Sequence, residues 1–261
     1  MYCKNCTASL RTDFSFCPSC GAKVIRNRLT VKNIWFDITE RFFNIDNTFL
    51  STFLHLFTKP HIVIEGYLAG VRKKYVNPVS YMAIALTLTG LMLFFLKRSF
   101  PEGLDFDLFN TGVYDQEVAK KMTDFMFTFH SALFLLYIPI LAGCGYIAFK
   151  KKAYNYPEFV ITFIYTQAQL SLFAVGTTLL VLAIAPDWYM SFSMISLLIT
   201  IGYSLYVMKK MSNQTRGEFL FSVVAFLFMF GVGFALLSII QNIAMANYIG
   251  LSFIEMMGPK R

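Results

Sequence analysis

Four cysteines near the N-terminus have the residue type and spacing of a metal site. Two residues separate Cys3 from Cys6, two separate Cys17 from Cys20, and ten lie between the two pairs. Thiolates in this pattern are typical of tetrahedral zinc, because a two-residue gap lets both sulfurs of a pair reach one ion. Iron in a rubredoxin-like site and disulfide bonds are the alternatives. Zinc is the favoured interpretation, because the predicted compartment is the reducing cytosol, where disulfide bonds are rare.

The predicted zinc has a structural role. Four cysteine ligands leave no coordination position for water or substrate, so a catalytic Zn²⁺ is disfavoured. Residues 1–28 are too few to bury a core, and the metal would supply most of their folding free energy. We therefore expect a small zinc ribbon over this segment. Thr7 follows Cys6, where a glycine would suit the turn better, whereas Gly21 follows Cys20 as the geometry prefers.

The rest of the chain has the composition of a membrane protein. Of its 261 residues, 56% are hydrophobic and only 15% are charged, which is too few charges to cover the surface of a soluble enzyme. Five uncharged runs approach or exceed the roughly 18–20 residues that a helix needs to cross a bilayer. They are residues 79–96, 125–149, 159–185, 188–208 and 219–240. The predicted fold is an all-α integral membrane protein with a transmembrane bundle over residues 77–261.

The basic residues predict the orientation of these spans. With the N-terminus in the cytosol, the cytosolic segments hold seventeen Lys and Arg and the outer segments hold six. Cytoplasmic loops of membrane proteins carry such an excess. Five crossings then place the N-terminus in the cytosol and the C-terminus outside, in the cell inner (cytoplasmic) membrane.

Residues 29–76 are predicted to form amphipathic helices at the membrane interface. Apolar residues, including Trp35 and Phe42, recur at helical spacing between charged ones. Asp46–Asn47–Thr48 is expected to break the first helix and to cap a second. The second helix is expected to end before Pro60, and a third to run from Pro60 to about Leu68. Basic and aromatic residues then follow directly: Arg72, Lys73, Lys74 and Tyr75. Their types suit an anionic headgroup layer, with simple anchoring as the alternative to specific lipid recognition.

Several of these segments together resemble the DUF3667 family. They are the two cysteine pairs, the aromatic amphipathic stretch, residues 52–60 and the run YLAGVRKKYVNP at residues 67–78. That family comprises uncharacterised bacterial membrane proteins. The resemblance implies an inner-membrane location and a zinc-ribbon head, and it carries over no catalytic residue.

Polar side chains within the predicted spans are few. None of the five runs contains Asp, Glu, Lys or Arg, and the polar candidates are His130, Gln167, Gln169, Gln241 and Asn242. Such residues either hydrogen-bond between helices or line a polar path. His55 and His61 lack an obvious partner in the sequence and are expected at ordinary solvated positions. Phosphate-binding, dinucleotide-binding, serine-hydrolase and zinc-protease motifs are absent from the sequence.

These observations favour a noncatalytic adaptor or lipid-surface-sensing protein with a structural zinc head. The alternative is a small permease or channel subunit with a polar path lined by His130 and Gln167, and a lipid-modifying enzyme is a distant third. The lipid bilayer, with anionic headgroups, is the expected partner. A cytosolic protein and further copies of the chain are possible additional partners. Nucleic acid is not expected, because the basic residues alternate with large apolar ones that suit a bilayer.

Overall fold

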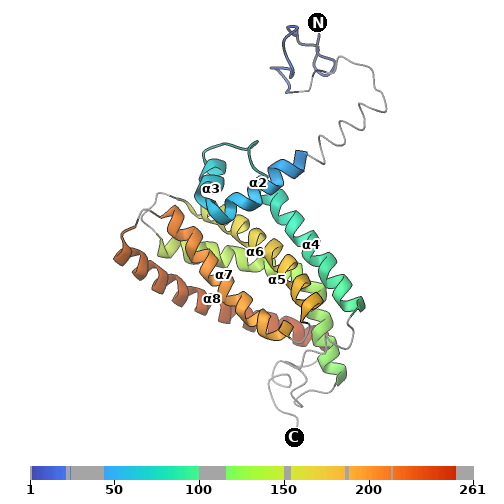
Figure 1. The fold of residues 1–261 in the computed structure, drawn as a ribbon, viewed down its shortest axis with the longest axis vertical. Coiled ribbons are helices and arrows are strands. Elements are labelled where there is room, and N and C mark those ends of the chain that lie inside the picture. Colours follow the sequence, from blue (N-terminus) through green and yellow to red (C-terminus); the bar gives the residue numbers. More distant parts are fainter. Residues whose placement is uncertain are drawn as a thin grey trace. The chain divides into compact units, whose positions relative to one another are not determined.

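The computed structural model describes residues 2–21, 24, 44–99, 116–149, 154–185, 188–212 and 214–250. Contacts divide the chain into two compact units, Met1–Asn47 and Thr48–Arg261. The first contains the four cysteines, and we call residues 2–21 the cysteine head. The second contains long helices together with the two short helices that precede them (Figure 1).

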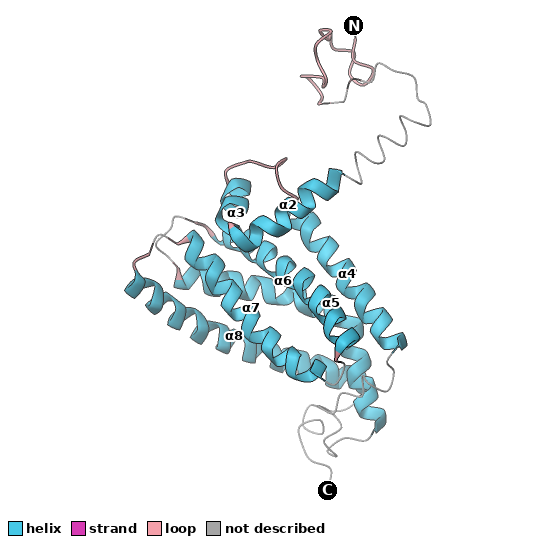
Figure 2. Ribbon diagram, viewed as in Figure 1, coloured by secondary structure: helices cyan, strands magenta, loops and turns pink. Residues whose placement is uncertain are grey.

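Seven helices make up the regular structure of the described residues, which contain no strand (Figure 2). The short ones are α2 (Asn44–Thr58) and α3 (Pro60–Leu68). The long ones are α4 (Pro78–Ser99), α5 (Gln116–Ala148), α6 (Tyr156–Ile184), α7 (Tyr189–Met211) and α8 (Arg216–Ile249). The predicted all-helical class is therefore confirmed. The first predicted amphipathic helix, with Trp35 and Phe42, lies outside the described residues.

Local sequence signals account for several helix ends. Asn155 caps α6 in a capping box, because its side chain accepts the Glu158 N–H while the Glu158 carboxylate accepts the Asn155 N–H. Pro60 begins α3, where its missing N–H costs nothing. Gly70 follows the end of α3 with φ of 96°, a conformation that favours glycine, and donates its N–H to the Tyr67 carbonyl.

Four helical segments are long and apolar enough to cross a membrane. They are Pro78–Leu96, Lys120–Ala148, Tyr156–Ile184 and Arg216–Ile249. They coincide with four of the five predicted spans, so a multi-pass membrane protein is supported. The remaining predicted span, residues 188–208, falls on α7, a helix of 23 residues that is not among the four. The count of five spans stays a prediction.

The long helices pack in alternating directions. α6 packs against α4, α5 and α7, and α8 packs against α5. Ring contacts place the end of α5 beside the starts of α6 and α8, and the start of α5 beside the end of α8: Tyr146–Phe159, Phe149–Phe219 and Phe125–Tyr248. α6 and α8 therefore both run antiparallel to α5. The end of α7 lies beside the start of α6, because the Thr162 hydroxyl is 3.9 Å from the Met211 sulfur.

The two short helices close one end of this bundle. Leu56 in α2 and Val63 and Ile64 in α3 are fully buried and belong to the main hydrophobic core, with residues of α4, α5, α6 and α7. We call the surface formed by α2, α3 and the loop at residues 69–77 the cap, and the end of the bundle that it covers the capped end. α2 and α3 therefore pack on the bundle, and whether their outer faces meet lipid stays a prediction.

Candidate metal centre and capped end

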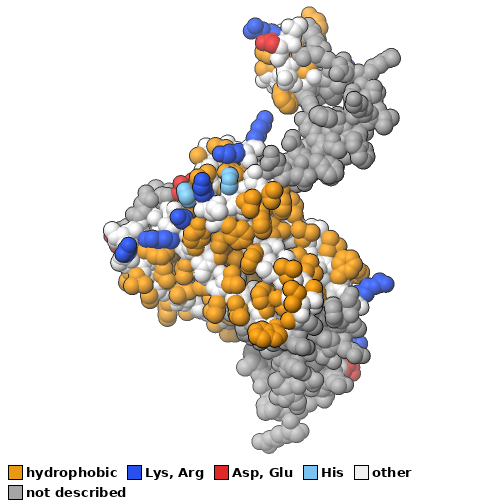
Figure 3. Space-filling view, in the orientation of Figure 1, with side chains coloured by type: hydrophobic (Ala, Val, Ile, Leu, Met, Phe, Trp, Pro, Cys, Tyr) orange, Lys and Arg blue, Asp and Glu red, His pale blue; other side chains and the backbone are white. Residues whose placement is uncertain are grey.

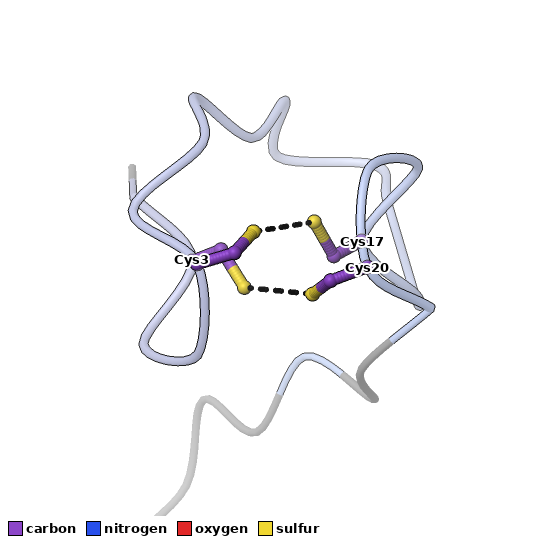
Figure 4. A group of neighbouring side chains, drawn as sticks. Cys3, Cys17 and Cys20 are labelled. Atoms are coloured by element: carbon purple, nitrogen blue, oxygen red, sulfur yellow. Dashed lines mark hydrogen bonds between the residues drawn. The ribbon is translucent and has the colours of Figure 1, made fainter.

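The cysteine head brings all four predicted ligands together. Cys3 and Cys20 have their sulfurs 3.7 Å apart, and those of Cys6 and Cys17 are 3.6 Å apart (Figure 4). All four sulfurs lie within 4.8 Å of one another. Disulfide bonds would need about 2.05 Å, and all four cysteines are free thiols. The disulfide alternative is thus disfavoured by the geometry of the site.

The sulfur separations fit a tetrahedral metal. Zinc–sulfur bonds of about 2.3 Å at tetrahedral angles place neighbouring sulfurs roughly 3.8 Å apart. The two short separations are close to this value. Four thiolates also have the softness that selects zinc or iron over magnesium or calcium. The four cysteines can therefore hold a metal ion of this kind.

Two tight turns position the sulfurs. The Thr7 N–H donates to the Cys3 carbonyl at 2.9 Å, and the Gly21 N–H donates to the Cys17 carbonyl at 2.8 Å. Both turn residues have positive φ, 60° at Thr7 and 71° at Gly21. This conformation is free of strain for glycine, whereas it costs a threonine roughly 1–2 kcal/mol. The first turn is therefore the strained one, at the position where the sequence lacks the favoured glycine.

Crowding of the thiols opposes their ionisation. The Asn5 and Cys6 backbone N–H groups lower the pKa of the Cys3 thiol. The Ala8 N–H acts in the same direction on Cys6, but the Cys20 thiol, burial and the other two thiols together raise the pKa of Cys6 to about 12. The raised pKa of Cys6 thus opposes its ionisation at neutral pH. A bound cation favours the charged forms.

The capped end is held by side chains that reach from the long helices to the backbone of the cap. Tyr81 of α4 donates its hydroxyl to the Gln169 Oε1, and the Gln169 Nε2 donates to the Phe53 carbonyl of α2 at 3.1 Å. Tyr81 and Gln169 are fully buried. Both polar ends of the Gln169 amide are therefore satisfied, and this residue joins three helices.

Further tyrosines bind main-chain carbonyls of the cap. Tyr203 of α7 donates to the Leu56 carbonyl at 2.9 Å, and Tyr206 donates to the Thr58 carbonyl at 3.2 Å. These carbonyls lie in the last turn of α2, where no later turn supplies a donor. Tyr165 of α6 donates to the Val76 carbonyl at 2.7 Å, which fixes the loop before α4.

His55 is part of this arrangement, contrary to the solvated position expected from sequence. Its Nδ1 is 2.9 Å from the Tyr75 hydroxyl, so the end of α2 contacts the loop before α4. The Val76 N–H donates to the Thr52 hydroxyl at 3.0 Å in the same region. His61 is half-buried, and its Nδ1 has no hydrogen-bond partner in the described part of the chain. The prediction was wrong for His55 because its partner is twenty residues away.

Basic side chains gather at the capped end on the face drawn in Figure 3. Arg72, Lys73 and Lys74 are exposed in the loop between α3 and α4, whereas Tyr75 is buried beneath them. Arg72 lies over the Tyr67 ring and Lys74 over the Tyr75 ring. The end of α7 and the start of α8 add three more exposed basic residues: Lys209, Lys210 and Arg216.

The structure does not bring the five polar-path candidates to one place. Gln169 is bonded within the cap, and Asn242 donates to the Ser238 carbonyl one turn earlier in its own helix. His130 is half-buried beside Phe134, and its Nδ1 has no partner among the described residues. Gln241 lies in α8 and is also half-buried. Gln167 lines a cavity between α5, α6, α7 and α8.

Sequence reasoning missed four residues that hold the capped end together: Thr52, Tyr81, Tyr165 and Tyr203. Their hydrogen-bond partners lie between 24 and 147 residues away along the chain. Tyrosines within an apolar run give one usable signal, because a phenolic hydroxyl buried in lipid or protein needs a partner. The sequence does not say which one.

A family model matches residues 46–90, with the description protein of unknown function (DUF3667). This segment of the chain is therefore similar to DUF3667. The DUF3667 match begins within α2 and ends within α4, so it covers the cap from residue 46 onward and includes Tyr81. It does not reach the cysteine head. Comparisons with curated proteins and with solved structures gave no match.

Proposed function

We propose that this protein is a noncatalytic membrane adaptor whose capped end faces the cytosol and binds anionic lipid headgroups, with a structural zinc ion in the cysteine head. One observation carries the proposal: exposed basic side chains gather at the end of the bundle where the cap is locked onto the long helices.

The helix directions support five spans. α6 and α8 run in the same direction, since both begin beside the end of α5. If both cross the membrane, the chain must return across it between them. α7 is the returning segment, because its end lies beside the starts of α6 and α8, where Thr162 approaches Met211 and Lys209 lies over the Phe219 ring. Five spans place the capped end and the C-terminal end of α8 on opposite sides.

The charge distribution supports headgroup binding in the cytosol. Arg72, Lys73 and Lys74 are fully outside the core, and each basic residue near an anionic surface contributes about 1 kcal/mol. Three acidic residues lie at the same end: Glu65 accepts from the Tyr154 hydroxyl, and Glu158 and Glu218 are engaged in capping boxes at the starts of α6 and α8. Basic residues outnumber them among the described residues of this end, so its charge is net positive, as expected of a cytosolic face.

The head suits a binding role more than a chemical one. Its four sulfurs would fill the coordination sphere of a Zn²⁺ ion, which leaves no site for a substrate. Its three buried residues, Cys3, Leu10 and Cys17, are too few for a stable core without a metal. A cytosolic protein is the partner that a small surface of this kind would engage.

The distribution of intramembrane amides favours the adaptor over the permease. A polar path requires unpaired polar groups that follow one another across the bilayer. Gln169 and Asn242 have their amides engaged in hydrogen bonds within the protein, and the one lined cavity that holds Gln167 is otherwise mainly apolar. The permease therefore remains the second candidate.

Lipid binding at the capped end can be tested with the full chain in nanodiscs of defined composition. Replacing part of the phosphatidylcholine by phosphatidylglycerol should raise the melting temperature of the wild type, because a ligand of the native state stabilises it. Substituting Arg72, Lys73 and Lys74 together by Gln should abolish most of this increase. Raising the ionic strength should reduce it as well.

A matched control removes charge from the other end of the bundle. Lys120→Gln with Lys121→Gln alters two exposed basic residues at the start of α5. This variant should keep the full response to phosphatidylglycerol. Equal loss in the two variants, or no response in the wild type, contradicts the proposed headgroup site.

The topology can be tested by reporter fusions at the C-terminus. Five spans predict a reporter outside the cytosol when the cysteine head is inside it. Cytosolic reporter activity would show that α7 does not cross, and the orientation would have to be revised.

A further inference from the structure

We infer that the bundle contains a binding site for an uncharged portion of a membrane-dissolved molecule, which presents one carbonyl or hydroxyl oxygen to Gln167. This site is independent of the cysteine head and of the basic residues at the capped end. It consists of a cavity of about 260 Å³ between α5, α6, α7 and α8. The walls are mainly apolar and aromatic: Phe134, Tyr137, Leu141, Ile201, Phe226, Phe230 and Phe234.

The packing of the helices explains why a cavity exists here. α8 packs on α5, whereas α7 packs on α6 and α3. Gly233 allows the close approach on one side, because a side-chain carbon at this position would lie 2.7 Å from the Ile140 Cγ2. α7 and α8 thus make their principal contacts with different helices. The space left between α7 and α8 is lined by aromatic rings.

Gln167 is the polar group for which this cavity provides no partner. It is only 5% exposed, and it makes no hydrogen bond within the described part of the chain. Two of the three hydroxyl-bearing residues of the lining have their hydroxyl groups engaged: Thr200 donates to the Ser196 carbonyl at 2.9 Å, and Ser204 to the Thr200 carbonyl at 2.8 Å. The third is Tyr137. Leaving a buried amide unpaired is costly, so a ligand that bonds to it gains affinity.

Gln169, the other buried glutamine of α6, does have hydrogen-bond partners for its amide. Gln169 lies two residues further on, and its amide both accepts from Tyr81 and donates to Phe53. The bundle therefore satisfies one buried glutamine completely and leaves the other open to a cavity. An amide has both donors and an acceptor, so it can bond either to a carbonyl or to a hydroxyl.

The remaining properties of the site define the ligand class. The described lining contains no charged side chain, which excludes a charged ligand at this depth. The volume exceeds the ~150 Å³ of an apolar cavity that holds benzene, so a substituted ring or a folded segment of an acyl chain fits. Two sources in a membrane supply this chemistry: a ring lipophile such as a quinone, and the ester and chain of a phospholipid.

The experiment uses the full chain in phosphatidylcholine nanodiscs and two probes. One is decylubiquinone, which has ring carbonyls, and the other is a phosphatidylcholine with a photoactivatable diazirine on its acyl chain. We expect saturable stabilisation by the first or saturable cross-linking of the cavity residues by the second. A response to the quinone alone identifies a ring ligand, and a response to the acyl probe alone identifies a lipid tail. No saturable response to either overturns the inference.

Two variants make the test specific. Gln167→Leu removes the amide at nearly constant volume, and it should weaken probe binding about threefold to tenfold while raising the melting temperature of the probe-free protein. A residue with a purely structural hydrogen bond would show the opposite change in stability. Ser204→Leu should block binding by filling the cavity with the amide intact. Wild-type affinity in both variants overturns the inference.

Discussion

The cysteine head and the capped end are stabilised in different ways. In the head, four side chains within twenty residues converge on one point, and the described residues bury only Cys3, Leu10 and Cys17. In the capped end, Tyr81, Tyr165, Gln169 and Tyr203 reach across 88 to 147 residues of sequence to carbonyls and amides of other elements. The head thus depends on its ligands, whereas the capped end depends on packing and distributed hydrogen bonds.

The largest expected effect is loss of the metal from the head. Purified protein should contain about one zinc ion per chain, and Cys17→Ser should remove it. Because structural zinc contributes roughly 10–16 kcal/mol to the folding of small domains, the head should unfold while the bundle keeps its melting temperature. Elemental analysis measures the metal, and limited proteolysis within residues 1–28 measures the unfolding.

Cys144→Ser is the control for this comparison. Cys144 is the fifth cysteine and is buried in α5, so its substitution should leave the zinc content unchanged. Iron in place of zinc would change the identity of the centre. A metal-free wild type from a reducing preparation would show that the head does not depend on a metal at all.

A smaller effect is expected from breaking one hydrogen bond of the capped end. Tyr81→Phe leaves the Gln169 Oε1 without its donor in a fully buried position, so the bundle should lose roughly 1–3 kcal/mol. The zinc content should not change. Thermal unfolding in nanodiscs measures the loss.

Tyr206→Phe is the matched control within the same cap. Its hydrogen bond to the Thr58 carbonyl is exposed, and water can replace the lost donor. We expect less than about 0.5 kcal/mol for this change. Equal losses in the two tyrosine variants would mean that burial of the hydroxyl does not decide the stability of the cap.

A modest effect, and a gain in stability rather than a loss, is expected at Thr7. Replacing it by glycine relieves the strain of a φ of 60° and should stabilise the metal-bound head by about 1 kcal/mol. The glycine also loosens the unfolded chain, which offsets part of the gain. Zinc competition with a chelator measures the difference. Weaker zinc retention in Thr7→Gly than in the wild type would show that the Thr7 hydroxyl bond to the Cys6 carbonyl outweighs the strain.

The cysteine head depends on a local motif and the capped end on distant partners, and this difference decides how well each could be predicted from the sequence. The spacing of Cys3, Cys6, Cys17 and Cys20 predicts their convergence, because a local motif leaves the chain few other arrangements. The end of α2 before Pro60, the bounds of α3 and four of the spans also follow from local signals. The start of α2 differs, since the helix runs through Asp46–Asn47–Thr48, where a break was expected.

The arrangement of the capped end could not be predicted in this way. Gln169 was a candidate for a polar path, and only the packing of α4 and α2 against α6 shows that its amide is used within the protein. His55 finds Tyr75 for the same reason. Partner choice among distant polar residues depends on helix rotation and register, which hydropathy alone does not fix.

The way in which α2 accepts its hydrogen bonds affects how this region can evolve. The acceptors at Phe53, Leu56 and Thr58 are carbonyl groups, which every amino acid supplies. Side chains on the exposed face of α2, such as Leu50 and Leu54, can therefore change without removing any of these acceptors. The donors Tyr81, Gln169 and Tyr203 have no such freedom, because only their own side chains reach those positions. Mutational tolerance in this protein should thus be unequal across a single interface, high on the exposed face of α2 and low at the donor positions of the long helices that hold it.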